Sequence, residues 1–185
     1  MAVAKKIKEE IEIPNDVQIE IVNGTIKVKG PKGSVERKLT NPKIKISKEN
    51  SKLVLTTTIA KPSKREKTII GTFKSHIKNL IKGVTEGYVY KLKICSSHFP
   101  MNVSVENNFV VIKNFIGEKI PRKAEILPNV NVKVEGDVII VEGLNKENVA
   151  QTANRIEQTT AIKSRDRRIF QDGCYIFSKA GKEIK

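Results

Sequence analysis

Basic residues close to the C-terminus are the side chains whose type and spacing first suggest chemistry. The stretch from residue 162 to 181 reads IKSRDRRIFQDGCYIFSKAG and holds Lys163, Arg165, Arg167 and Arg168 within six positions. A guanidinium group can bind two phosphate oxygens at once, whereas lysine supplies a mobile point charge. Five of the seven arginines of the chain lie after residue 95. This pattern indicates a surface that binds a polyanion.

Side chains of catalytic type are sparse and poorly spaced. His76 and His98 have no Cys, Asp or His at the spacing of a metal site or a catalytic triad, so we expect both to pack or to form hydrogen bonds. The stretch GPKGS at 30–34 lacks the spacing of a phosphate-binding loop and reads as a turn. Cys95 and Cys174 lie far apart, without a CxxC partner, and are expected to be reduced and partly buried. We predict no catalytic residue, no metal site and no cofactor.

The charge of the whole chain supports a polyanionic partner. The 185 residues carry a net charge of +15, which destabilises a compact chain unless a partner neutralises it. Aromatic residues make up 5% of the chain and tryptophan is absent, so recognition by stacking on single-stranded bases is disfavoured. Recognition of the backbone of a folded RNA by Lys and Arg is favoured instead. No apolar stretch is long enough to span a membrane and the N-terminus lacks an apolar signal core, so we expect a cytoplasmic protein without a membrane partner.

The elements that must position these cations occur twice along the chain. Residues 16–39 and 102–126 each alternate apolar and polar residues around a turn, at Asn23-Gly24 and at Asn107-Asn108. A pair of short strands follows in each half, at 43–57 and at 131–143.

One helix then follows each pair of strands. The first helix is expected to begin with a capping box between Ser63 and Glu66 and to end at Gly83. The second is expected to begin after Asn145, with Val149, Ala153, Ile156 and Thr160 on one face.

This order predicts an α+β fold of two similar tandem domains, each a small antiparallel sheet covered by one amphipathic helix. We place the first domain at residues 1–83 and the second at 84–185, opened by a strand over Tyr88–Ile94. A chance likeness between two β-rich segments is the alternative, and the matching order of the elements makes it the weaker one.

The C-terminal stretch QTTAIKSRDRRIFQDGCYIFSK, residues 158–179, resembles the C-terminal signature of the large-ribosomal-subunit protein six family in its archaeal and eukaryotic form. Cys174 stands where the family has an aliphatic residue. The matching residues are Gln158, Ile162, Arg165, Arg168, Phe170, Asp172, Gly173, Tyr175, Ile176 and Lys179. VKGPKG at 28–33, NLIKGVTEGYVYKL at 79–92, HFPMNV at 98–103 and NFIGEK at 114–119 also look like the family. The stretch TTTIAKPSKRE departs from the eukaryotic relatives, which carry tryptophans there.

The resemblance implies two similar α+β domains and a structural, non-enzymatic protein of the cytoplasmic ribosome with a role in translation. Its implied partners are large-subunit rRNA and neighbouring ribosomal proteins, with translation GTPases transiently nearby. It implies a position near the docking region of these GTPases and the sarcin–ricin loop, with much of the RNA contact made by the second domain and the C-terminal segment.

From these observations we select the candidate RNA-binding residues. They are Lys163, Arg165, Arg167, Arg168 and Lys179, then Lys119, Arg122 and Lys123, and in the first domain Lys29, Lys32, Lys64 and Arg65. We expect Phe170, Tyr175 and Phe177 to anchor the C-terminal segment, and Asp166 to pair with a neighbouring arginine. Two other functions are left open by the residues alone: an RNA-binding or chaperone-like module outside the ribosome, and an enzyme, which would need a cleft with titrating groups.

Overall fold

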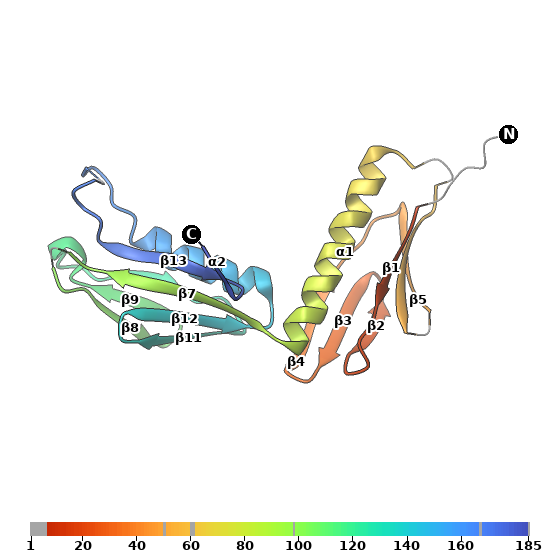
Figure 1. Cartoon of the computed structure of the whole chain (residues 1–185), viewed down its shortest axis with the longest axis horizontal. Coiled ribbons are helices and arrows are strands. Elements are labelled where there is room, and N and C mark those ends of the chain that lie inside the picture. The colour runs from red at the N-terminus through yellow and green to blue at the C-terminus, as the bar shows by residue number, and fades with distance from the viewer. Residues whose placement is uncertain (1–6, 50, 60–61, 98, 167, 185) are drawn as a thin grey trace. The chain divides into compact units, whose positions relative to one another are not determined.

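The chain folds into two compact units, Met1–Glu86 and Gly87–Lys185. The computed structural model describes residues 7–49, 51–59, 62–97, 99–166 and 168–184. Each unit contains antiparallel sheets and one long helix (Figure 1). No helix within these described ranges is long and apolar enough to cross a membrane.

The first unit contains two three-stranded antiparallel sheets. One has the order β1-β6-β5 and the other β2-β3-β4. The strands are β1 (Lys8–Glu12), β2 (Gln18–Val22), β3 (Thr25–Gly30), β4 (Gly33–Lys38), β5 (Ile44–Glu49) and β6 (Lys52–Thr57). The predicted hairpin at Asn23-Gly24 is confirmed, and both turn residues have positive φ, 48° and 76°, as a tight two-residue hairpin requires.

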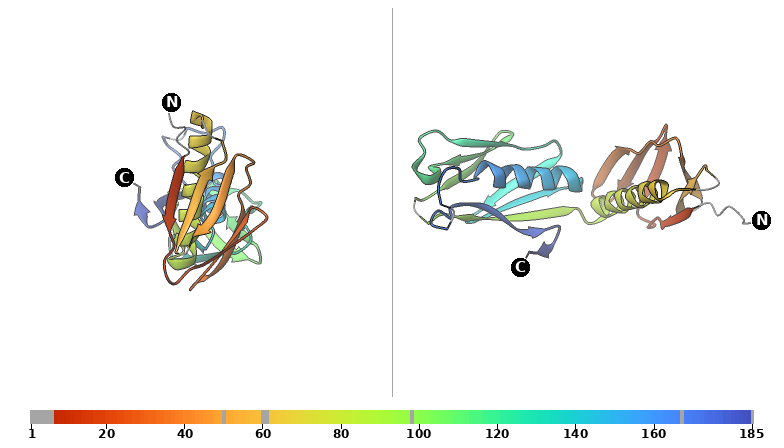
Figure 2. Two further views of the ribbon diagram at one scale, coloured as in Figure 1. Left: turned by 90° about the vertical axis from the view of Figure 1, so that its right-hand side faces the viewer. Right: turned by 90° about the horizontal axis from the view of Figure 1, so that it is seen from above.

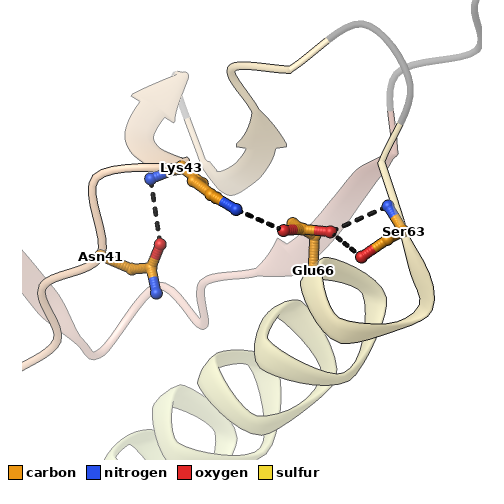
Figure 3. Close-up of polar contacts among 4 residues, drawn as sticks. All are labelled: Asn41, Lys43, Ser63 and Glu66. Carbon is orange, nitrogen blue, oxygen red and sulfur yellow. Dashed lines mark hydrogen bonds and ion pairs between the residues drawn. The ribbon is translucent and has the colours of Figure 1, made fainter.

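Helix α1 (Lys64–Thr85) covers the core of this unit, and its capping box is confirmed (Figure 3). The Glu66 carboxylate accepts hydrogen bonds from the Ser63 N–H, at 2.8 Å, and from the Ser63 hydroxyl. It also pairs with the Lys43 ammonium at 3.0 Å. These partners, the Ser63 hydroxyl first, lower the pKa of the buried Glu66 to about 2.

The predicted end of this helix at Gly83 is wrong. The helix continues to Thr85, the Glu86 N–H still donates to the Lys82 carbonyl, and Gly83 is buried. The left-handed residue that ends it is Gly87, with a φ of 78°. The domain boundary expected at 83/84 therefore falls inside α1, and the two units meet at 86/87.

The second unit repeats this order and then adds strands. Its sheets have the orders β10-β9-β8 and β11-β12-β7-β13-β14. The strands are β7 (Tyr88–Cys95), β8 (Asn102–Glu106), β9 (Phe109–Lys113), β10 (Arg122–Glu125), β11 (Val130–Glu135), β12 (Val138–Gly143), β13 (Gly173–Lys179) and β14 (Lys182–Glu183), with a short 3-10 turn η1 (Phe115–Gly117). The prediction that a strand beginning at Tyr88 opens this unit is confirmed.

Helix α2 (Lys146–Thr159) packs against both sheets of the second unit. The Asn145 side chain accepts a hydrogen bond from the Glu147 N–H at 3.0 Å, so the predicted cap is confirmed. Val149, Ala153 and Ile156 are fully buried on the predicted face.

The predicted α+β class with two tandem units is confirmed, but each unit contains two sheets where one was expected. The reason is that some strands pair with strands that lie far away in the sequence. Sequence periodicity reveals hairpins between neighbouring strands, whereas β1 pairs with β6 and β7 with β12 across long stretches of chain.

Candidate nucleic-acid interface

The C-terminal cations lie on the loop between α2 and β13. Lys163, Arg165 and Arg168 are all exposed there, and Arg167 lies outside the described residues. The Arg165 guanidinium stacks on the Phe170 ring, 4.8 Å from its centroid. This stacking restricts the orientation of one cation.

Both ends of this loop are fixed by buried hydrogen bonds. At the helix end, the Thr160 hydroxyl accepts a hydrogen bond from the Cys174 N–H at 3.0 Å. At the strand end, the buried Asp172 carboxylate accepts one from the Ser97 N–H. Since Thr160, Asp172 and Cys174 are almost fully buried, the cations belong to a loop held at both ends and not to a loose tail.

Asp166 shapes the middle of the loop. Its side chain accepts a hydrogen bond from the Arg168 N–H at 2.9 Å, and its carbonyl accepts from the N–H groups of Ile169 and Phe170. We expected an ion pair with an arginine, and within the described residues no such pair forms. Asp166 forms a turn instead, because its short carboxylate reaches the main-chain N–H two residues on.

Tyr175 holds the segment by a hydrogen bond and does not enter the core: its hydroxyl donates to the Asp172 carbonyl at 3.4 Å. Tyr175 remains 40% exposed, while Cys174 beside it is fully buried in the core and keeps the packing that we expected of a small hydrophobe. Alternate residues of a strand face opposite sides, so one of the two has to face out. Phe170 and Phe177 are half-buried.

Arg122 joins the 160–172 loop to the loop that leads into β10. One of its amino groups donates to the carbonyls of Thr159, at 2.7 Å, and Ala161, at 3.2 Å. The guanidinium also pairs with both carboxylate oxygens of Glu118, at 2.8 and 2.6 Å, and stacks on the Phe115 ring at 4.2 Å. Arg122 was selected as a phosphate contact, but these bonds occupy its guanidinium and give it a positioning role.

Lys119 lies on this second loop, whereas Lys123 lies on the strand that follows it. Lys119 is exposed between η1 and β10, and Lys123 is exposed on β10, directly opposite Val111 of β9. The hydrogen bonds from Arg122 are the largest cause of the lowered pKa of Glu118. Burial opposes them, and the charges of Arg122 and then of Arg165 add smaller decreases.

The segments 96–97 and 99–101, between β7 and β8, form a third loop that meets the other two at the same end of the second unit, near the start of β13 in Figure 1. The Asn114 side chain donates to the Pro100 carbonyl at 3.0 Å, and the Phe99 ring packs against Gly117. The three loops form one surface, which we call the loop interface.

Three apolar side chains are exposed on the loop interface, and the sequence did not lead us to predict them as part of it. Ile120 is 81% exposed, Ile169 64% and Phe99 47%. Isolated exposed apolar residues are ordinary, but three among the cations offer apolar contact to riboses or bases beside the phosphate contacts. For Ile120 and Ile169 the signal in the sequence is an apolar residue directly beside basic ones, as in GEKIPRK and RDRRIF; Phe99 has no such signal.

The remaining candidates lie elsewhere. Lys179 is at the far end of β13, near Tyr90 and Glu157. In the first unit, Lys29 pairs with Glu20 at 3.9 Å, and the Lys32 ammonium donates to the Glu86 carbonyl near the end of α1.

Lys64 and Arg65 are exposed at the opposite end of α1. A helix of 22 residues is about 33 Å long, so the first-unit candidates do not form one site. Among the described residues, no three His, Cys, Asp or Glu side chains are gathered as a metal site would need.

Comparison with known proteins gives this arrangement a family. The sequence model described as ribosomal protein L6 matches residues 13–87 and again 99–173, so it finds the same duplication. The chain belongs to the ribosomal protein L6 family. It is 50% identical to the large ribosomal subunit protein uL6 of Methanococcus vannielii over 184 residues, the full length of both chains. It is 48% identical to the protein of the same name from Methanobrevibacter smithii, over 97% of this chain and 99% of the relative.

Membership in the ribosomal protein L6 family confirms the resemblance seen in the C-terminal signature. The relatives are named as ribosomal proteins of the large subunit and not as enzymes. The second family match covers residues 99–173, so it contains the 160–172 loop and the loop that leads into β10, whereas Ser97 and most of β13 lie outside it.

Proposed function

We propose that this chain is a structural protein of the large ribosomal subunit that binds large-subunit rRNA through the loop interface of its second unit. The observation that supports this proposal is the exposure and the pairing of the cations. Lys119, Lys163, Arg165 and Arg168 are exposed, and none forms an ion pair with a carboxylate of the described residues. Six lysines elsewhere, Lys8, Lys43, Lys52, Lys74, Lys82 and Lys113, have carboxylate partners. Lys27, Lys38 and Lys45 of the first unit are exposed without one in the described part of the chain, so what distinguishes the interface cations is that they gather at loops held by buried side chains.

Unpaired cations on a fixed loop suit a polyanion of defined shape. Each phosphate contact releases counterions from the RNA, and a loop that is already ordered loses little entropy on binding. Arg122 supports this function indirectly, because it holds the two cationic loops together. We retain Lys119, Lys163, Arg165 and Arg168 as phosphate contacts. Lys123, on β10, is assigned to the edge of the interface.

We further propose that the interface lies near the sarcin–ricin loop, in the docking region of the translation GTPases, with other ribosomal proteins as neighbours. Support for this location comes from the family resemblance, and the geometry contributes only a site suited to folded RNA. Lys29, Lys32, Lys64, Arg65 and Lys179 are left as separate, secondary contacts.

The salt dependence of binding tests this function. We expect Lys163→Ala, Arg165→Ala and Arg168→Ala together to weaken binding to a large-subunit rRNA fragment. The slope of log K against log salt concentration should become shallower by roughly 2 to 3, about 0.7 to 0.9 for each phosphate that is no longer neutralised. The matched control removes three exposed lysines of the first unit, Lys27, Lys38 and Lys45. An equal change in both variants would show that only total charge matters and would refute the assigned interface.

A further inference from the structure

The strand that follows the helix belongs to the next unit in the first repeat and to the same unit in the second repeat. Helix α1 is followed by Gly87-Tyr88-Val89-Tyr90, in β7, and α2 by a loop and Gly173-Cys174-Tyr175-Ile176, in β13. The two family matches end at Gly87 and Gly173, so the duplication places β7 and β13 at equivalent positions of the repeat.

In the second unit the strand after the helix completes a sheet of the same unit. Strand β13 pairs antiparallel with β7, on the edge that β12 leaves open, and packs beside α2. Helix side chains also bind its backbone: Glu157 accepts from the Ile176 N–H at 3.1 Å and Thr160 from the Cys174 N–H at 3.0 Å.

In the first unit the equivalent place beside β1 has no strand within the described residues. Strand β1 corresponds to β7, since both open a unit and pair with the strand before the helix. The strand after α1 is β7 itself, which belongs to the second unit. Strand β1 is therefore the last strand of the sheet β1-β6-β5, as the left view of Figure 2 shows.

The backbone of β1 presents unpaired groups at this edge. The Ile7 and Ile13 N–H groups donate toward β6, to the Thr57 hydroxyl at 3.3 Å and the Ser51 carbonyl at 2.9 Å. Because successive residues of a strand alternate, the N–H and C=O groups of the even-numbered residues 8, 10 and 12 face away from the sheet.

A hollow of about 590 Å³ runs along this edge, between β1 and α1. Ile11, Pro14, Ile81 and Thr85 give it an apolar lining. Lysines of α1 line one side, at 74, 78 and 82, while Glu10 and Glu12 of β1 lie on the other side. The space is of the kind that an added strand fills, with its inward side chains against the helix.

We infer that the open edge of β1 receives an extended segment of another protein of the ribosome, which runs antiparallel to β1 as β13 runs to β7. The segment places small apolar side chains toward Ile11 and Ile81, as β13 places Cys174 toward its own core. Its outward side chains are polar and lie beside Glu12 and the Glu10 carboxylate, which pairs with Lys8 and Lys52. The main chain supplies the affinity and the alternation of side chains supplies the specificity. This inference adds a protein partner to the proposed function and rests on the chain being part of the ribosome.

Other occupants fit this edge less well. RNA is disfavoured because the alternating N–H and C=O groups of a strand edge pair with another polypeptide backbone, and a sugar–phosphate chain does not offer that pattern. A second copy of the chain is disfavoured because two chains of net charge +15 repel each other.

Photo-crosslinking from the edge in purified large subunits tests the inference. We would replace Glu12 with the photoreactive residue p-benzoylphenylalanine, incorporate the chain into the particle and irradiate. We expect an adduct with a different protein that survives ribonuclease, mapped by mass spectrometry to an extended segment. An adduct with rRNA only, an adduct with a second copy, or no adduct would overturn the inference.

A proline variant separates backbone pairing from simple proximity. Glu10→Pro removes an N–H that faces away from the sheet, and an edge strand tolerates proline at such a position. We expect this change to reduce the adduct at least tenfold, while Glu10→Gln, which keeps the N–H, preserves it. Equal adducts in the two variants would refute strand addition.

Hydrogen exchange gives a readout that does not need the variant to assemble. We expect the amides of Lys8, Glu10 and Glu12 to exchange at least tenfold more slowly in the particle than in the isolated chain. Slow exchange in both would show that the chain covers its own edge and would also overturn the inference. A natural chain that does not bind rRNA but still gives the protein adduct in the particle would contradict the proposed rRNA contact and leave this inference intact.

Discussion

The position of Arg122 yields a prediction that separates its geometry from its charge. Its guanidinium donates to two carbonyls at the end of α2, pairs with both oxygens of Glu118 and stacks on Phe115. Charged hydrogen bonds contribute about 1.5 to 3 kcal/mol each, and the stacking about 0.5 to 1 kcal/mol. These terms are not additive, and the exposed ion pair adds little, so we expect Arg122→Ala to cost the second unit about 2 to 3 kcal/mol.

Arg122→Lys should cost nearly as much, because one ammonium cannot replace a planar fork that makes four hydrogen bonds. Denaturant unfolding followed by tyrosine fluorescence measures this, since Tyr88, Tyr90 and Tyr175 all lie in the second unit. If Arg122→Lys restored the stability of the natural chain, charge alone would explain the residue and its positioning role would be refuted.

Three further predictions concern the first unit. Gly30→Ala should destabilise it by about 1 to 3 kcal/mol in denaturant unfolding, because the new Cβ would lie 2.6 Å from Cγ2 of Val84. Gly71→Ala, at a helical glycine with nothing within 4 Å, should stabilise it by up to about 1 kcal/mol. Glu66 has a folded pKa of about 2 against an ordinary value of 4.5, so its contribution to stability is present above pH 4.5 and is lost as the pH falls toward 2. In Glu66→Gln, unfolding measured across this window should lose that part of its pH dependence.

The predictions for Gly30→Ala and Glu66→Gln each have a result that would contradict them. Equal stability of Gly30→Ala and the natural chain would mean that β3 and α1 do not approach as closely as described. A Glu66→Gln chain with an unchanged acid response would mean that the capping carboxylate is not held in its charged form by Ser63 and Lys43.

Local signals in the sequence predicted most of the elements, because these elements are specified by neighbouring residues. The Asn23-Gly24 turn, the Ser63–Glu66 box and the Asn145 cap each depend on residues within a few positions. Gly83 misled the prediction of a helix end. A glycine ends a helix only where the backbone turns left-handed, and that occurs at Gly87.

The interface was only partly predictable, because its geometry depends on contacts distant in sequence. The arginine cluster is visible in the sequence, but the hydrogen bond from the Ser97 N–H to Asp172 and those from Arg122 to the end of α2 are not. Without these hydrogen bonds, Arg122 and Arg165 look equivalent. In the structure, Arg122 holds two loops together, whereas Arg165 is an exposed cation. The alternation that buries Cys174 and exposes Tyr175 could have been predicted from the strand itself. The prediction instead followed the large aromatic ring of Tyr175, which is often buried.

The central claim is that the loop interface contacts large-subunit rRNA near the sarcin–ricin loop, and cleavage from a tethered radical source tests it most directly. An iron chelate would be attached to a cysteine introduced by Ser164→Cys, in a chain that also carries Cys95→Ser. A second chain with Asn23→Cys at the first hairpin serves as the control. We predict that, in assembled large subunits, the chelate at 164 cuts rRNA strongly around the sarcin–ricin loop and that the chelate at 23 does not. Absence of cleavage from 164, or the same cleavage pattern from both positions, would contradict the assigned interface.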